Sequence, residues 1–172
     1  NLEWYIEGGR GRTGKLRPPR FGLLTYLTKA FQVSGASDVY LVPVALSYDQ
    51  LYEVGAMAAE ALGAEKTPEG LRWMVGYVRA QGKRNGVAHV TIGRPLSLAD
   101  ALSQETDQRL AIQKAGIEVC HRINEVTPVT VSSLAMLAFL GIEDRALTVR
   151  ELTAILTPLF GYITARNLPI AG

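Results

Sequence analysis

The sequence contains few of the side chains that form disulfides, bind transition metals or act as nucleophiles near neutral pH. Its 172 residues include one cysteine, Cys120, and two histidines, His89 and His121. A single cysteine excludes an internal disulfide, so nothing indicates an oxidising compartment. We expect Cys120 to be a small, buried helical residue without a catalytic role, and we expect no metal and no cofactor.

Long apolar runs are also missing. No stretch reaches the roughly 20 apolar residues that a membrane-spanning helix needs. The longest candidate, VSSLAMLAFLGI at 131–142, contains two serines and predicts a core helix. The first residue is Asn1 and no signal-peptide pattern follows, so we expect the chain to continue a longer protein.

What the sequence does have is an ordinary globular composition with one concentrated basic stretch. Hydrophobic residues make up 48% and charged residues 20%, and the net charge is +2. Of the 18 basic residues, five lie close together, which leaves 13 against 16 acidic residues elsewhere. These five are Arg10, Arg12, Lys15, Arg17 and Arg20. A local cluster indicates a site for an anion rather than a protein that coats nucleic acid.

Strand and helix patterns alternate over the first part of the chain. The expected strands are 2–7, 38–48 and 86–93, and the expected helices are 21–34, 50–62 and two that follow Thr67 and Ser97. This alternation predicts the α/β class, with a mostly parallel or mixed sheet flanked by helices. Pro43 has no N–H to donate within the second strand, so it marks a break, a bulge or an edge there.

The pattern changes after about residue 105, where no further strand is expected. One apolar stripe at helical spacing consists of Ile112, Ala115, Gly116, Val119 and Ile123. A second helix follows at 131–141, and Thr148 with Glu151 predicts a capping box before a third. We therefore predict two parts, an α/β part at 1–104 and a small all-helical C-terminal unit at 105–172.

The stretch from Gly9 to Lys15 has the spacing G-x-x-x-x-G-K of a nucleotide-binding loop. Such a loop also needs Ser or Thr after the lysine and a helix that begins there. Here Leu16 follows, and the pair Pro18 and Pro19 delays the helix. The glycines, with Glu7 before them and arginines at alternate positions, instead suit a small phosphorylated polyol, because guanidinium groups bind phosphate oxygens in pairs. A solvated basic loop without a ligand is the other interpretation.

Several segments together carry a family resemblance. YIEGGRGRTGKLRPPRFGLL resembles the third sequence block, F-x-E-G-x-R-S-R-T-G, of the glycerol-3-phosphate acyltransferases, and VYLVPVALSYD resembles their fourth. PEGLRWMVGYVRAQGKRNGVAHVTIGRPLSL and VCHRINEVTPVT are similar to stretches that follow in the large bacterial enzymes. The similarity runs in one order over nearly the whole chain.

The resemblance implies acyl transfer from acyl-CoA or acyl carrier protein to the 1-hydroxyl of sn-glycerol 3-phosphate, which gives lysophosphatidic acid for phospholipid biosynthesis. It further implies a peripheral location on the cytoplasmic side of the cell membrane. In the family the third block helps to hold the glycerol phosphate, and a proline stands in the fourth. The substrate-binding residues implied here are Glu7, Gly8, Gly9, Arg10, Arg12, Thr13, Lys15 and Pro43. Thr13 and Lys15 are the weaker candidates among them, as is Gly14.

Two departures from the family pattern matter. Gly11 stands where the family has a serine between the arginines. The catalytic H-x-x-x-x-D block is absent, because Arg94 follows His89 at that spacing and Val126 follows His121. We expect both histidines to be structural and the catalytic block to lie in a missing N-terminal part of the same protein. This chain alone is then expected to be inactive.

Two other functions compete with this interpretation. A dihydroxyacetone phosphate acyltransferase presents the same phosphate to the arginines, so the sequence separates it only weakly. A helix-turn-helix nucleic-acid module around GIEDRALT needs a basic last helix, and that helix offers only Arg150 and Arg166, so no nucleic-acid partner is expected. The apolar stripe of the same helix indicates packing on the core, with an interfacial position on a membrane as the alternative.

Overall fold

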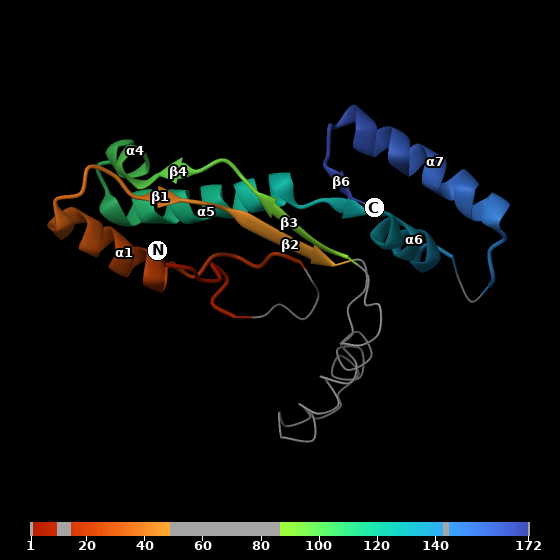
Figure 1. Cartoon of the computed structure of the whole chain (residues 1–172), viewed down its shortest axis with the longest axis horizontal. Helices are drawn as coiled ribbons and strands as arrows, with labels where there is room; N and C mark the ends of the chain where they lie inside the picture. The colour runs from red at the N-terminus through yellow and green to blue at the C-terminus, as the bar shows by residue number, and fades with distance from the viewer. Residues whose placement is uncertain (1, 10–14, 49–86, 143–144, 172) are drawn as a thin grey trace, which may run out of the picture. The chain divides into compact units, whose positions relative to one another are not determined.

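The computed structural model describes residues 2–9, 15–48, 87–142 and 145–171. The chain divides into two compact units, one made of Asn1–Leu46 with Val90–Thr127 and the other of Ser47–His89 with Pro128–Gly172. Figure 1 shows the elements along the chain. The long helix after residue 105, predicted to belong to a separate C-terminal unit, thus lies in the first compact unit. The expected helix at 50–62 and the one after Thr67 lie outside the described residues.

The first described segment, from Leu2 to Glu7, does not form the predicted strand. Its burial alternates as in a strand, since Ile6 is buried and Trp4 half-buried, but within the described ranges it pairs with no other strand. The backbone turns instead, because the N–H of Gly8 donates to the carbonyl of Tyr5 at 2.9 Å. The alternating pattern therefore predicted correctly which side chains are buried. It was wrong about the hydrogen bonding, because the segment does not pair as a strand.

Helix α1, Phe21–Ser34, forms as the apolar spacing predicts and ends at Gly35, whose φ of 68° is the left-handed conformation that glycine adopts at low cost. Its buried residues are Leu24 and Thr28, and the Thr28 hydroxyl donates to the Leu24 carbonyl at 2.8 Å. This bond satisfies the one buried polar side chain on the inner face of the helix.

Four short strands form a broken two-stranded ribbon. Its strands are β1 (Tyr40–Leu41), β2 (Val44–Tyr48), β3 (Ala88–Ile92) and β4 (Leu96–Ser97). β1 pairs with β4 in antiparallel register, and β2 neighbours β3. The predicted strand at 38–48 is thus interrupted between β1 and β2, at Pro43, as expected for a residue that cannot donate to a ladder.

Two helices complete the first unit. In α4, Leu98–Ser103, the Ser97 hydroxyl accepts from the N–H of Asp100, and in α5, Gln108–Val126, the Asp107 carboxylate caps the first turn. The carboxylate of Asp38 accepts from the N–H groups of Val39 and Ala99, which ties β1 to the start of α4. The pKa of Asp38 is lowered, and the largest cause is the hydrogen bond that its carboxylate accepts from the Ala99 N–H.

The core of the first unit lies where α5 meets these elements. Its buried members are Ile6, Leu24, Leu41, Leu98, Ile112, Ala115 and Val119. Gly116, on the same stripe, lies against the ring of Phe21 so closely that an added Cβ would be 2.8 Å from the ring. The small residues of the predicted stripe therefore set the distance between α5 and α1.

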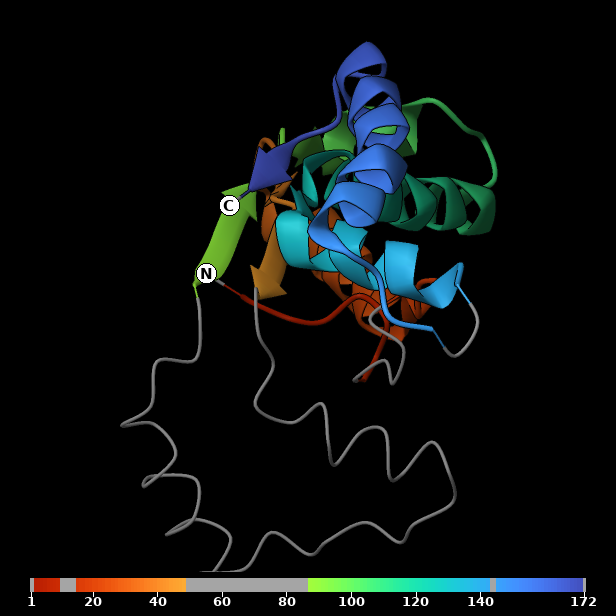
Figure 2. The same ribbon diagram turned by 90° about the vertical axis from the view of Figure 1, so that its right-hand side faces the viewer.

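The second unit contains α6 (Val131–Leu140) and α7 (Val149–Ala165), which pack together and are seen from another side in Figure 2. The predicted capping box of Thr148 and Glu151 is confirmed, and Thr130 with Ser133 forms another. The prediction of an all-helical C-terminal part is wrong in one respect. Strands β5 (Val129–Thr130) and β6 (Ile170–Ala171) pair in parallel there.

Together these elements confirm the α/β class, with small strand pairs of both directions between helices. Among the described helices, none has the length and hydrophobicity required to cross a membrane.

The close contact at Gly116 gives a stability prediction. We expect Gly116→Ala to destabilise the protein by about 1–3 kcal/mol, because the new methyl group displaces the Phe21 ring in a packed region. Gly161→Ala, in α7, is the matched control, since no atom lies within 4 Å of its added Cβ. It should leave stability unchanged or raise it by up to about 1 kcal/mol. Urea unfolding measures both, and equal effects would contradict the packing argument.

The capping box of α7 gives a pH prediction. The N–H and hydroxyl of Thr148 both donate to the Glu151 carboxylate, and together with Arg145 they lower its pKa from 4.5 to about 2. Since the folded pKa is depressed, the contribution of the box to stability is complete above pH 4.5 and is lost as the pH falls toward 2.

A carboxylate titration followed by NMR should therefore find a Glu151 midpoint near 2. In Thr148→Ala the backbone donor remains and the hydroxyl donor is lost, so the midpoint should rise part of the way toward 4.5. A wild-type midpoint at 4.5 would contradict the box as the cause of the shift.

Candidate functional site

The site predicted from the sequence begins at a tight turn in the first unit. Gly8 has a φ of 70°, and its N–H closes the turn on Tyr5. The N–H of Arg20 donates to the carbonyl of Ile6 at 2.7 Å, so the two ends of the glycine-rich segment are joined across the base of the loop. One end of the loop is thus bonded to Tyr5 and the other to the core residue Ile6.

Gly8 is required at its position for two reasons. Its positive φ is rarely adopted by residues with a side chain. A Cβ there would also lie 2.8 Å from Cγ of Arg20, whereas nothing lies within 4 Å of a Cβ on Gly9. The Arg20 side chain therefore packs directly over the turn at Gly8.

Five of the eight predicted binding residues fall within the described part of the chain. Glu7 is half-buried, and Gly8, Gly9 and Lys15 are exposed. Arg10, Arg12 and Thr13 lie outside the described residues, as does Gly14. Pro43, the fifth, is buried between β1 and β2. Their role as a substrate site remains a prediction.

Glu7 is near Cys120 on α5. Burial and, to a smaller extent, the negative charge of Glu7 raise the pKa of the Cys120 thiol. A thiol with a raised pKa is a weak nucleophile near neutral pH.

Pro43 is held by residues that sequence reasoning did not identify. Its carbonyl accepts from the N–H of Gly93 at 2.8 Å, and a Cβ on Gly93 would lie 3.3 Å from Cβ of Pro43. Arg122 of α5 fixes the turn after Gly93, because its Nη1 donates to the carbonyls of Arg94 and Pro95. Glu118 accepts from its Nε at 2.7 Å. The Gly-Arg-Pro sequence directly after a predicted strand was the only signal for this arrangement.

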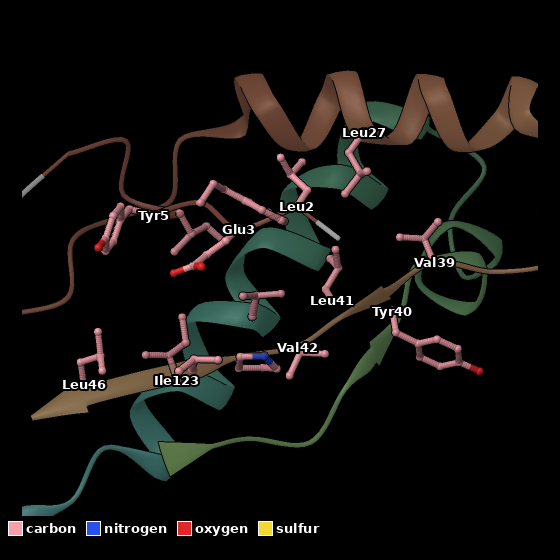
Figure 3. A pocket seen from close by; sticks show the side chains of 15 residues that line it. Leu2, Glu3, Tyr5, Leu27, Val39, Tyr40, Leu41, Val42, Leu46 and Ile123 are labelled. Atoms are coloured by element: carbon pink, nitrogen blue, oxygen red, sulfur yellow. The ribbon is translucent and has the colours of Figure 1, made fainter. Parts of the chain in front are cut away.

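A groove of about 810 Å³ adjoins the turn, and sequence reasoning did not predict it. The side chains around it come from the N-terminal segment, α1, the β1–β2 stretch and α5, as Figure 3 shows. Among the described residues that line it, Glu3 alone carries a charge. Pro43 and Ile6 both line it, so the groove joins the fourth-block proline to the segment that leads into Glu7.

The two histidines are placed in different environments. His89 is half-buried in β3. His121 is exposed on α5, with Nε2 3.4 Å from Oε1 of Glu125. The described residues contain no group of three or more side chains able to hold a metal ion. The described part of the site thus consists of a hydrogen-bonded glycine turn with an apolar groove beside it.

Comparison with known proteins identifies the family. Residues 57–172 match the sequence model of the family described as the glycerol-3-phosphate acyltransferase C-terminal region. The whole chain is 48% identical, over 176 aligned residues, to proteins named "Putative acyltransferase plsB1" in Mycobacterium bovis and Mycobacterium tuberculosis. It spans 28% of the length of these relatives. The chain therefore belongs to the glycerol-3-phosphate acyltransferase family, in its C-terminal region.

Proposed function

We propose that this chain is the acceptor-binding part of an acyltransferase that uses sn-glycerol 3-phosphate. The observation that carries the proposal is the turn at Gly8, whose φ is positive and which is closed by a bond to Tyr5, while Arg20 bonds to Ile6 at the other end of the loop. That turn opens the segment GGRGRTGK in a chain that belongs to this family. An anchored, glycine-rich backbone allows close approach of a phosphate, and guanidinium groups bind its oxygens in pairs.

The reaction proposed for the whole protein joins an acyl group to the 1-hydroxyl of the acceptor. The hydroxyl oxygen forms an ester bond with the acyl carbonyl carbon, while the bond from that carbon to the sulfur of CoA or acyl carrier protein breaks. The hydroxyl proton passes through a general base to the leaving thiolate. Neither His89 nor His121 is followed at the fifth position by aspartate, so this base is assigned to the rest of the protein.

The residues proposed to bind the acceptor divide by chemistry. Arg10 and Arg12 bind the phosphate dianion, with Thr13 and Lys15 as further donors. Glu7, half-buried at the base of the loop, accepts from a glycerol hydroxyl or orients an arginine. Pro43 keeps the β1–β2 break rigid beside the groove. The product carries both an acyl chain and a phosphate, so a peripheral position at the cytoplasmic face of the membrane is proposed with it.

The first test removes the guanidinium groups from the full-length enzyme. We expect Arg10→Ala and Arg12→Ala each to raise the KM for glycerol 3-phosphate about 10- to 100-fold, because each loses a charge-assisted hydrogen bond to a ligand bound in the ground state. Arg17→Ala is the control, since it removes the same charge outside the G-x-R-x-R-T-G segment and should change KM less than about threefold.

An unchanged KM in both variants would remove these arginines from the site. Competition between glycerol 3-phosphate and dihydroxyacetone phosphate in the same assay identifies the acceptor. Preference for the ketone would reassign the substrate while leaving the phosphate contacts in place.

The second test uses the backbone of the turn. Gly8→Ala introduces a side chain at a φ of 70° and against Arg20, so it should raise the KM for glycerol 3-phosphate about fivefold or more. Gly9→Ala, with open space around its Cβ, should stay within about twofold of wild type. If Gly9→Ala were as harmful as Gly8→Ala, the conformation of Gly8 would not be what positions the loop.

A further inference from the structure

The apolar groove of the first unit is bordered by large hydrophobic side chains that remain exposed. These are Leu2, Tyr5, Tyr40, Val42, Val44 and Leu46, each between 45% and 72% exposed, and all of them line the same groove. Figure 3 shows several of them facing the opening from the N-terminal segment and from the β1–β2 stretch. Exposed apolar surface gathered in this way marks a contact surface rather than ordinary solvent-exposed side chains.

The strand ribbon beside the groove also has large hydrophobic side chains that remain exposed. Ala45 of β2 is buried, while Val44 and Leu46 on its other face are about half exposed. On β3, Val90 and Ile92 are 61% and 67% exposed. A two-stranded pair is only marginally stable by itself and normally needs a partner on its apolar face. One face of this ribbon therefore lacks a partner in the described part of the chain.

A buried polar atom indicates the kind of partner. The indole N–H of Trp4, a residue that lines the groove, is buried, and the described structure provides no acceptor for it. Buried donors are almost always paired, because an unpaired one loses its bond to water without replacement. A polypeptide offers a carbonyl oxygen at every residue, whereas the hydrocarbon tail of a lipid offers none. The unpaired donor thus favours a protein segment as the partner.

The comparisons and the path of the chain support the choice of one protein segment as this partner. This chain spans 28% of the length of its relatives and matches the C-terminal region of the family, so most of the related proteins lies outside it. Leu2 and Glu3 line the groove, so polypeptide that precedes them enters at the groove itself.

We propose that the groove and the exposed face of β2 are the surface on which the part of the acyltransferase preceding Asn1 packs, with one of its backbone carbonyls accepting from Trp4 Nε1. This proposal shares one assumption with the proposed function, namely that the chain is part of a longer acyltransferase. Since Ile6 lines the groove and Glu7 follows it, the interface lies directly beside the glycine turn. A general base on the preceding part then reaches the acceptor that the turn holds.

The test uses the full-length protein with the photo-crosslinking residue p-benzoylphenylalanine in place of Leu46. On irradiation we expect an intramolecular crosslink to a peptide that precedes Asn1, identified by mass spectrometry in a mixture of unlabelled and ¹⁵N-labelled copies. The same residue in place of Val33, which is 85% exposed on α1 and does not line the groove, should give no such crosslink. A lipid adduct, a crosslink between copies, or no crosslink at Leu46 would each overturn the proposal.

A second measurement does not depend on a bulky residue. Leu46→Cys should react with a maleimide at least tenfold more slowly than Val33→Cys in the folded full-length protein. The exposed fractions within this chain, 50% and 85%, differ by less than twofold, so a bare groove would give similar rates. Val44→Cys repeats the test at a second position if the first variant does not fold. Neither measurement uses enzymatic activity, so a failed KM prediction for Arg10 and Arg12 leaves this result independent.

Discussion

The first unit depends on one stripe of α5, on which α1 and α4 pack and which Ile6 and Leu41 join in the core. Ala115 and Gly116 have little or no side chain, so Phe21 and Leu24 of α1 approach the stripe closely. Ile112 and Val119 fill the space on either side. Leu41 from β1 and Leu98 from α4 bury their side chains in the same cluster. Because protein interiors are close-packed, larger side chains on this stripe would shift the strand ribbon and the N-terminal segment together.

Two sets of hydrogen bonds connect the candidate site to this core and fix its position. Ile6 is a core residue, and its carbonyl bonds to Arg20 at the start of α1, so the glycine turn lies at a fixed place on the surface. At the other end of the groove, the Pro43 carbonyl is bonded to Gly93, and Arg122 of α5 holds the adjoining turn. A loop that binds a small anion gains affinity from such anchoring, since less conformational freedom is lost on binding.

Local signals in the sequence predicted what is locally determined. The end of α1 at Gly35, the capping box of Thr148 and Glu151, the α5 stripe and the break at Pro43 each follow from one residue or one periodicity, and each is confirmed. The errors concern pairing between distant segments. Alternation at 2–7 cannot show whether a ladder partner exists, and the two-residue strands β5 and β6 are too short to carry a pattern.

The groove and the Arg122 contacts were beyond prediction for the same reason, because they join segments about 30 to 120 residues apart in the sequence. For the candidate binding residues, the sequence motif gave their identity and the structure gave the anchoring of the turn. The binding roles of all these residues stay proposals, and Arg10, Arg12 and Thr13 lie outside the described residues.

The proposed division of chemistry between this chain and the rest of the protein has a physical consequence. A phosphate-binding loop contributes mainly affinity, whereas rate acceleration requires the hydroxyl, the acyl carbon and a general base to be aligned within about 3–3.5 Å. The proposed function assigns the base to the rest of the protein, because this sequence has no H-x-x-x-x-D block, and that alignment would then be set across the contact between the two parts. An apolar, close-packed interface is suited to the task, because it resists sliding more than a polar, hydrated one. In the enzyme proposed here, the exposed hydrophobic residues beside the glycine turn are thus where acceptor binding would be coupled to the position of the catalytic base.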